Sequence, residues 1–142
     1  MFSKEESKQI REEFWTSFGK SFPRKWILYD TKSKGLSFKF HFDTKYALVA
    51  LDIEDDLENR IKYWGKLQSL KSILLGEFLQ EAIFEELYYL ENGKEISRIY
   101  IPLDQKVSIH NKNTWQVVMV FFNKKMNLFE AFFEEYQDVI KG

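Results

Sequence analysis

The sequence predicts an α+β domain with the element order αβββαββα, in which long helices pack on a largely antiparallel five-stranded sheet. Apolar and polar residues alternate over residues 36–42, which is the period of a half-buried strand. Asn92-Gly93 stands between two runs of strand-forming residues and indicates a hairpin. Apolar residues then recur every three or four positions over residues 115–140, which indicates a long final helix.

The length and composition of the chain limit its class. At 142 residues it predicts a single domain over residues 1–142. It contains no cysteine, which excludes a disulfide framework, a zinc ribbon and thiol catalysis. No apolar run approaches the roughly 18 residues of a membrane span, and the N-terminus lacks the apolar region of a signal peptide. We therefore expect a cytoplasmic protein that does not enter a membrane.

The first elements follow from local signals. Ser3 and Glu6 form a capping box, in which each side chain accepts from the other residue's backbone N–H. An apolar stripe with a spacing of four residues continues this helix to about Gly19. The apolar run of residues 25–30 then predicts a first, short strand, and a turn leads from it into the strand of residues 36–42.

A hairpin and a second helix come next. The strand over residues 36–42 turns into a second run over residues 46–54. Asp55 is positioned to cap a helix that continues to about Glu81, passing or bending at Gly76.

The second half of the chain predicts another hairpin and the final helix. Strands are expected over residues 84–91 and 95–103, joined by a type I′ turn in which both Asn92 and Gly93 have positive φ. Asn113 is expected to cap the final helix.

The charge of the chain is unevenly distributed. The net charge is −1, but residues 1–50 carry ten basic and six acidic residues, a net of +4, whereas residues 51–142 carry eleven and sixteen, a net of −5. This asymmetry predicts two faces of different character.

The basic excess is densest over residues 20–45, where aromatic residues are interleaved with the cations. Cations beside rings suit single-stranded nucleic acid, which needs phosphate neutralisation and base stacking. The simpler interpretation is a solvated sheet face whose lysines protect an edge strand from aggregation. Lys39 and His41 are expected to point away from the core. The candidate nucleic-acid contacts are Lys25, Lys39, His41 and Lys45, with Trp26 and Tyr29 as neighbouring rings.

A second hypothesis concerns a metal. The expected αβββαβ opening is similar to the core of the PD-(D/E)XK nucleases, in which two carboxylates hold Mg²⁺ and a lysine steers the attacking water. The candidate ligands are Asp43, Asp52 and Glu54. Glu54 stands where that motif requires lysine, however, and Asp52 and Glu54 also suit the approach to a helix N-terminus.

The remaining polar patterns are weaker. Glu130, Glu134 and Asp138 form an acidic stripe at i, i+4 spacing, which suits a solvated face, a basic partner or a hard cation. His41 and His110 belong to no metal-binding spacing, and no nucleotide-binding or hydrolase motif is present. We therefore expect no cofactor, and a binding protein rather than an enzyme.

Several segments together resemble a bacterial family known as domain of unknown function 4268. They are Glu13-Phe14-Trp15, residues 38–54, residues 89–100, Asn113-Thr114-Trp115 and residues 129–136. The resemblance implies a domain that occurs alone or after a nuclease-like module, in association with DNA-handling systems, and it transfers no catalytic residue. Arg98, on an otherwise apolar strand, requires a partner.

These observations favour a small bacterial cytoplasmic binding or interaction module, whose partner is another protein or a second copy of the chain. One alternative is a nucleic-acid-associated domain that binds weakly through residues 24–45. The other is a divergent or inactive nuclease fold with the metal site described above.

Overall fold

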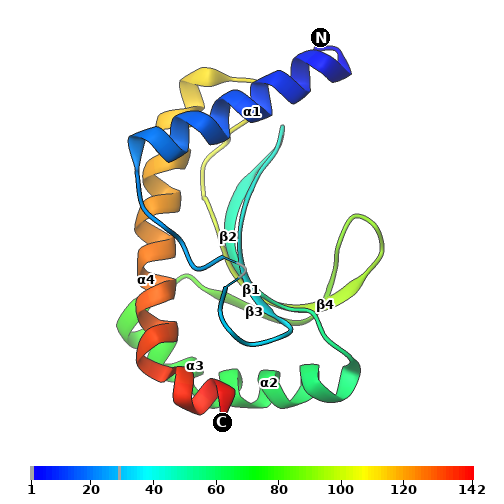
Figure 1. Ribbon diagram of the computed structural model, residues 1–142, viewed down its shortest axis with the longest axis vertical. Coiled ribbons are helices and arrows are strands. Elements are labelled where there is room, and N and C mark those ends of the chain that lie inside the picture. The colour runs from blue at the N-terminus through cyan, green and yellow to red at the C-terminus, as the bar shows by residue number, and fades with distance from the viewer. Residues whose placement is uncertain (1, 29) are drawn as a thin grey trace.

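The computed structural model describes residues 2–28 and 30–142 and has four helices and a four-stranded antiparallel sheet, in the order αββααββα (Figure 1). A π-helical turn, η1, and a 3-10 turn, η2, complete it. The elements are α1 (Lys4–Ser21), β1 (Leu36–Phe42), β2 (Ala47–Ile53), α2 (Leu57–Ser69), α3 (Lys71–Ile73), η1 (Leu74–Phe78), β3 (Ile83–Tyr89), β4 (Glu95–Pro102), η2 (Lys112–Thr114) and α4 (Trp115–Lys141).

The strands lie in the order β1-β2-β4-β3, and every neighbouring pair is antiparallel. β2 is an inner strand, and all of its residues from Ala47 to Ile53 are buried. Phe38, Leu51 and Ile99 stand opposite one another on three adjacent strands, so their side chains share one face of the sheet.

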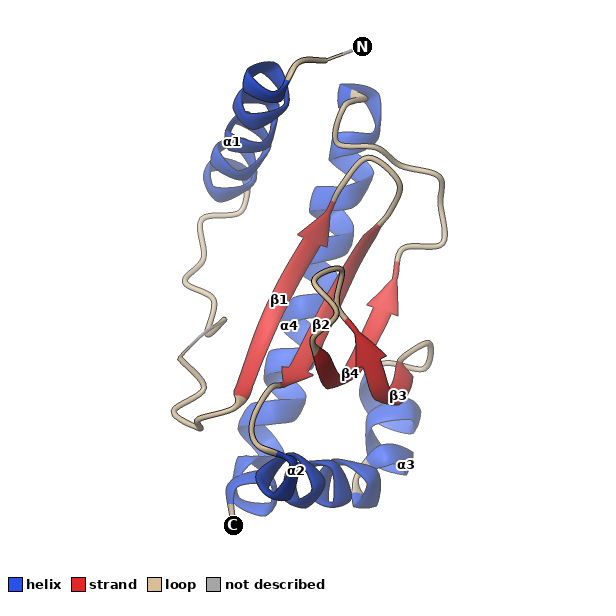
Figure 2. Ribbon diagram, turned by 90° about the vertical axis from the view of Figure 1, so that its right-hand side faces the viewer, coloured by secondary structure: helices blue, strands red, loops and turns tan. Residues whose placement is uncertain are grey.

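The long helix α4 covers that face (Figures 1 and 2). The ring of Phe38 lies 5.6 Å from the ring of Phe129 and 5.5 Å from that of Phe133, both on α4. Phe14 of α1 packs edge-on against Phe42 and is fully buried. The aromatic residues are thus largely used in one core, as their helical and strand spacing predicts. None of the helices in the described part of the chain is long and apolar enough to cross a membrane.

The predicted strand over residues 25–30 is wrong, which reduces five strands to four. The described residues of this segment run beside β1 as irregular chain (Figure 2), and only one backbone hydrogen bond joins them to β1, from the N–H of Phe38 to the carbonyl of Leu28 at 2.8 Å. Its apolar residues Trp26, Ile27 and Leu28 are half-buried against the core. Side-chain burial therefore explains the apolar run without a strand ladder. Tyr29 lies outside the described residues.

The helix boundaries differ from the prediction by a few residues. The capping box of Ser3 and Glu6 is confirmed. Asp56 rather than Asp55 caps α2, because its carboxylate accepts from the N–H of Asn59 at 2.9 Å. α2 ends at Ser69 and continues through α3 and η1 only to Phe78, short of Glu81. Similarly, the final helix begins at Trp115 after a 3-10 turn capped by Asn111, not by Asn113.

The second hairpin is confirmed, but its turn is of another type. Gly93 has a φ of +85°, whereas Asn92 is not among the described residues with positive φ, so the turn is not type I′. The N–H of Gly93 donates to the carbonyl of Leu90, and the N–H of Leu90 donates to the carbonyl of Lys94. This is the three-residue connection in which a left-handed residue follows a tight turn. The loop is longer than predicted because Glu91 also lies outside the ladder.

Candidate functional site

In the part of the chain that the structure describes, one face of the sheet has no helix packed on it (Figure 1). The strands curve, and their concave side faces away from α4 (Figure 1). We call this the open face. Alternation along the four strands assigns to it Ser37, Lys39, His41, Leu48, Ala50, Asp52, Glu85, Tyr88, Ile96, Arg98 and Tyr100.

At the centre of the open face lies a buried ion-pair network. Asp52 is fully buried and Arg98 is 6% exposed, although no helix covers them. The two residues stand opposite each other on β2 and β4, and Arg98 donates to both carboxylate oxygens, at 2.6 and 2.8 Å. The ammonium of Lys39, on β1, lies 3.0 Å from the same carboxylate. The structure thus supplies the partner that Arg98 requires. Such bidentate, charge-assisted pairs are strong and fix both side chains.

The network continues to the rim of the sheet. Lys39 also donates to Glu54 at 2.5 Å, and the other oxygen of Glu54 accepts from Lys94 at 3.0 Å. The hydrogen bond from Lys39 holds the pKa of Glu54 below its ordinary value. Burial opposes the charge of Lys39, but Glu54 and Asp52 outweigh it, so the pKa of Lys39 is raised. Both groups therefore stay charged around neutral pH.

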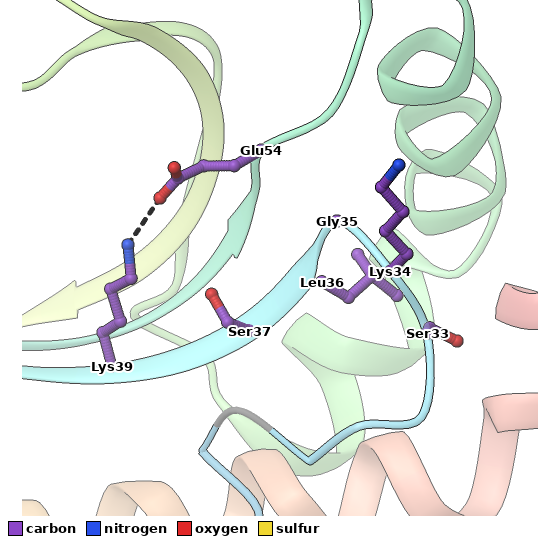
Figure 3. A pocket seen from close by; sticks show the side chains of 7 residues that line it. All are labelled: Ser33, Lys34, Gly35, Leu36, Ser37, Lys39 and Glu54. Carbon is purple, nitrogen blue, oxygen red and sulfur yellow. Dashed lines mark hydrogen bonds and ion pairs between the residues drawn. The ribbon is translucent and has the colours of Figure 1, made fainter.

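A shallow pocket of about 400 Å³ lies beside this ion pair. Figure 3 shows that Lys39 and Glu54 meet at one side of it, whereas Lys34 extends away from the pair. Gly35 lines the pocket with a φ of +90°, and a Cβ there would lie 2.7 Å from a carboxylate oxygen of Asp55. The close approach of Asp55 and the left-handed backbone both require glycine at this position.

A β-bulge places Tyr88 on the open face. Glu85 pairs with Arg98 and Tyr88 with Ile96, so two residues of β3 stand opposite Ser97 of β4. The extra residue reverses the alternation, and Tyr88, three residues after Glu85, points to the same side. Arg98 lies over the ring of Tyr88, with its guanidinium carbon 4.4 Å from the ring centroid.

A second tyrosine extends this cluster. The hydroxyl of Tyr100 donates to the carboxylate of Glu85, and its ring lies edge-on to Tyr88 at 5.6 Å. Burial, together with this hydrogen bond, raises the pKa of Tyr100. The site therefore holds aromatic rings, carboxylates and cations in fixed mutual positions.

The structure does not bring the four predicted nucleic-acid contacts together. Lys39 and His41 point away from the core, as predicted, but carboxylates neutralise Lys39, and His41 Nε2 lies 2.8 Å from Asp43. Lys45 is exposed in the turn between β1 and β2. Lys25 lies in the irregular segment before β1 rather than on the sheet.

Nor does it bring the three predicted metal ligands together. Asp52 and Glu54 are neighbours through Lys39, but Asp43 lies at the other end of the β1–β2 hairpin, about 20 Å away along the strand. The carboxylate of Asp43 is held by His41 and by the backbone N–H groups of Lys45 and Tyr46. Burial would raise the pKa of Asp43, but these hydrogen bonds outweigh it and lower the pKa. Among residues 2–28 and 30–142 no group of three His, Asp or Glu side chains is placed to hold a metal.

A separate basic region lies at the Lys45 end of the sheet. Two adjoining pockets of about 370 and 390 Å³ share Thr44 and Lys45. Arg11 of α1 lines one of them together with the carboxylates Asp43 and Glu91, and Lys106 lines the other. The second pocket is lined by two lysines and several hydroxyl and amide groups, and by no carboxylate. The sequence does not reveal this convergence, because the three cations come from distant parts of the chain.

Glu130 is another residue whose surroundings differ from the prediction. Of the acidic stripe on α4, Glu134 and Asp138 are exposed, but Glu130 is 1% exposed. Its carboxylate accepts from Arg24 at 2.9 Å and from the N–H of Ile27 at 2.8 Å. Spacing alone could not identify this role, since the segment that Glu130 anchors has no regular structure.

A model of the family described as Domain of unknown function (DUF4268) matches residues 10–137, which is nearly the whole chain. The chain belongs to this family, as the resemblance of its segments predicted. No curated protein and no solved structure matches it.

Proposed function

We propose that this member of the DUF4268 family is a binding module whose ligand surface is the open face of the sheet. The observation that carries the proposal is the buried network of Lys39, Asp52 and Arg98 on a sheet face without a helical cover. A rigid surface loses little conformational freedom on binding, and preorganisation of this kind increases affinity.

Binding fits this site better than catalysis does. Both carboxylate oxygens of Asp52 are engaged, and Lys39 contacts two carboxylates, so these groups are held in place by one another. The groups that reach solvent are at the rim, where Tyr46 is 37% exposed and the side chain of Lys94 is 57% exposed. Tyrosine and arginine are enriched at protein–protein interfaces, and this face carries Tyr46, Tyr88 and Arg98. A protein partner is therefore the favoured ligand.

A capture experiment tests this proposal. The immobilised domain is exposed to bacterial lysate, beside a Tyr46→Ala/Lys94→Ala variant of the rim and a Val139→Ala control on α4. We expect a partner retained by wild type and by the control but lost by the rim variant, with all three proteins folded by circular dichroism. Equal capture by all three proteins would show that the open face is not the ligand surface.

Nucleic-acid binding is the second candidate, centred on the two pockets at the Lys45 end of the sheet rather than on the whole of residues 24–45. The supporting observation is that Arg11, Lys45 and Lys106 converge on two adjoining pockets. Three phosphate contacts on a single strand predict a log–log salt slope of roughly −2. Fluorescence anisotropy with a labelled single-stranded oligonucleotide across a salt series measures this slope.

Charge-reversal variants separate the two possible basic surfaces. Lys45→Glu/Lys106→Glu is expected to lower both affinity and slope, whereas Lys66→Glu/Lys124→Glu serves as the matched control. Lys25→Glu tests the original prediction and is expected to change little. If Lys25→Glu weakens binding as much as the double variant does, the nucleic acid binds the surface over residues 24–45 instead. If wild type does not bind at low salt, the nucleic-acid candidate fails.

A further inference from the structure

Three of the exposed large apolar side chains gather on one side of the molecule, away from the open-face network. Leu57 and Ile61 are 62% and 57% exposed on α2, one helical turn apart. Leu87 is 57% exposed on β3. Scattered apolar residues on a surface need no explanation, but a contiguous group marks an interaction site.

These residues frame a groove between α2 and the β3–β4 hairpin, which we call the α2–β3 groove. Its volume is about 140 Å³, and Leu57, Ile61, Trp64 and Leu87 supply its apolar lining. Arg60 fixes the two walls to each other, because it donates to the carbonyl of Glu95 at 3.1 Å and to the carboxylate of Glu95 at 2.5 Å. The groove is therefore held open by a polar link across it.

The groove lies along a free sheet edge. β3 is the outermost strand on its side, and among residues 2–28 and 30–142 no backbone hydrogen bond joins its outer edge to another segment. An edge strand presents unpaired N–H and C=O groups to a further strand. A peptide paired with β3 would place alternate side chains on the groove side, beside Leu87.

The charge of this edge selects the occupant. β3 carries Glu85 and Glu86 and no basic residue, a net charge of −2. Glu86 lines the groove and is exposed, with no ion pair to it among the described residues. A second copy is disfavoured, because antiparallel pairing of β3 with itself about its centre sets Glu86 against Glu86, and like charges directly opposite are destabilising. The bulge also breaks the strand into short runs, which disfavours long self-pairing.

We propose that the outer edge of β3 binds a short extended peptide that carries an apolar and a basic residue on the same side. Its backbone pairs with β3, one apolar side chain enters the α2–β3 groove between Leu57, Ile61 and Leu87, and a Lys or Arg two positions away, on the same side of the peptide, faces Glu86. This proposal is independent of the open face, which lies on the other side of the sheet from the groove.

Synthetic peptides test the proposal directly. The probe is a fluorescein-labelled peptide that repeats two valines and two lysines, which places both residue types on each side of the strand. It is compared with a peptide in which glutamate replaces lysine and with a valine–lysine peptide whose backbone nitrogens are methylated. We expect saturable anisotropy with the first alone. Equal binding of the glutamate peptide would overturn the charge selection, equal binding of the methylated peptide would overturn strand pairing, and no binding of any peptide would overturn the whole proposal.

Variants locate the site. Leu87→Gln is expected to weaken binding about tenfold, the equivalent of losing most of a buried leucine contact, and Glu86→Lys is expected to weaken it further. Val120→Gln, on the exposed side of α4, is the matched control. Unchanged affinity in both groove variants would refute the assigned edge. Sedimentation velocity completes the test, because dimerisation of wild type that Leu87→Gln abolishes would make a second copy the occupant instead. Since Tyr46→Ala/Lys94→Ala leaves this edge intact, failure of the open-face proposal is distinguishable from failure of this one.

Discussion

The two edge strands of the sheet, β1 and β3, differ in what lies beside them. Beside β1, the irregular segment before the strand supplies Leu28, whose carbonyl accepts from Phe38, and Thr31, whose hydroxyl donates to the carbonyl of Leu36 at 2.9 Å. Glu130 on α4 anchors this segment. Beside β3, no described residue takes that place, and Leu87 remains exposed.

The same contrast extends to the chemistry of the two halves. Across β1, β2 and β4, the network of Lys39, Asp52 and Arg98 buries polar groups that satisfy one another, whereas β3 exposes the apolar side chain of Leu87. Buried polar groups and exposed apolar patches are the two departures from ordinary burial that carry information. The buried groups are satisfied within the chain, and the exposed side chain lies where we propose that a peptide binds.

The largest expected effect is at the buried ion pair of Asp52 and Arg98. Asp52→Asn leaves Arg98 buried without its anion and should lower the free energy of unfolding by about 3–5 kcal/mol. Urea denaturation measures this loss. The double variant Asp52→Leu/Arg98→Met should recover much of it, since no buried charge is then unpaired. A single variant as stable as wild type would show that the network is not structural.

The next largest effect is expected at the segment that lies beside β1. Glu130→Gln removes the charge that Arg24 pairs with and weakens the acceptor of Ile27, and should cost about 1–3 kcal/mol. Hydrogen exchange gives a local readout. The amide of Phe38 should lose protection, because its acceptor Leu28 belongs to the anchored segment. Unchanged protection at Phe38 would mean that the segment holds β1 without Glu130.

Two glycines with similar backbone angles form a matched pair, one from each half. Gly93→Ala meets no atom within 4 Å and should cost only its left-handed strain, about 1–2 kcal/mol. Gly35→Ala carries the same strain and also meets both the carboxylate and the Cβ of Asp55, at 2.7 and 2.9 Å. We therefore expect the larger loss at Gly35, measured by thermal denaturation of both variants. Equal losses of stability in the two variants would show that Asp55 moves away from the added Cβ at little cost.

The ion pairs at the rim should appear as a pH dependence. The folded protein holds the pKa of Glu54 below the ordinary value of 4.5, chiefly through Lys39. The stability that this gives is present above the ordinary pKa and is lost as the pH falls through the folded one. Glu54→Gln should therefore unfold with a shallower dependence on pH below 4.5 than wild type. Parallel curves for the two proteins, from urea denaturation at each pH, would contradict this assignment.

The smallest expected effect is at the open edge. Leu87→Gln removes a side chain that is already more than half exposed, so the free energy of unfolding should change by no more than about 0.5 kcal/mol. Urea denaturation of this variant and of Asp52→Asn compares the loss of unfolding free energy at the two places. A large loss at Leu87 would show that its contacts in the groove are structural.

The sequence by itself determined the elements whose signals are local. Alternation over residues 36–42 placed Lys39 and His41 on the side away from the core, the capping box at Ser3 began α1, and Asn92-Gly93 located the second hairpin. These signals relate residues only a few positions apart, and the geometry of a strand, cap or turn is set over that distance.

Only the tertiary structure decided which distant residues meet. Asp52 and Arg98 are 46 positions apart, and their pairing depends on the register between β2 and β4. The apolar run of residues 25–30 suited a strand, but the core buries its side chains equally well from an irregular chain, so its backbone needed no ladder. The spacing of Glu130 suited a solvated stripe, but in the structure its carboxylate accepts hydrogen bonds from Arg24 and Ile27, which are over 100 positions away in the sequence. Contacts of this kind depend on how whole elements pack, and the periodicity of one segment does not contain that information.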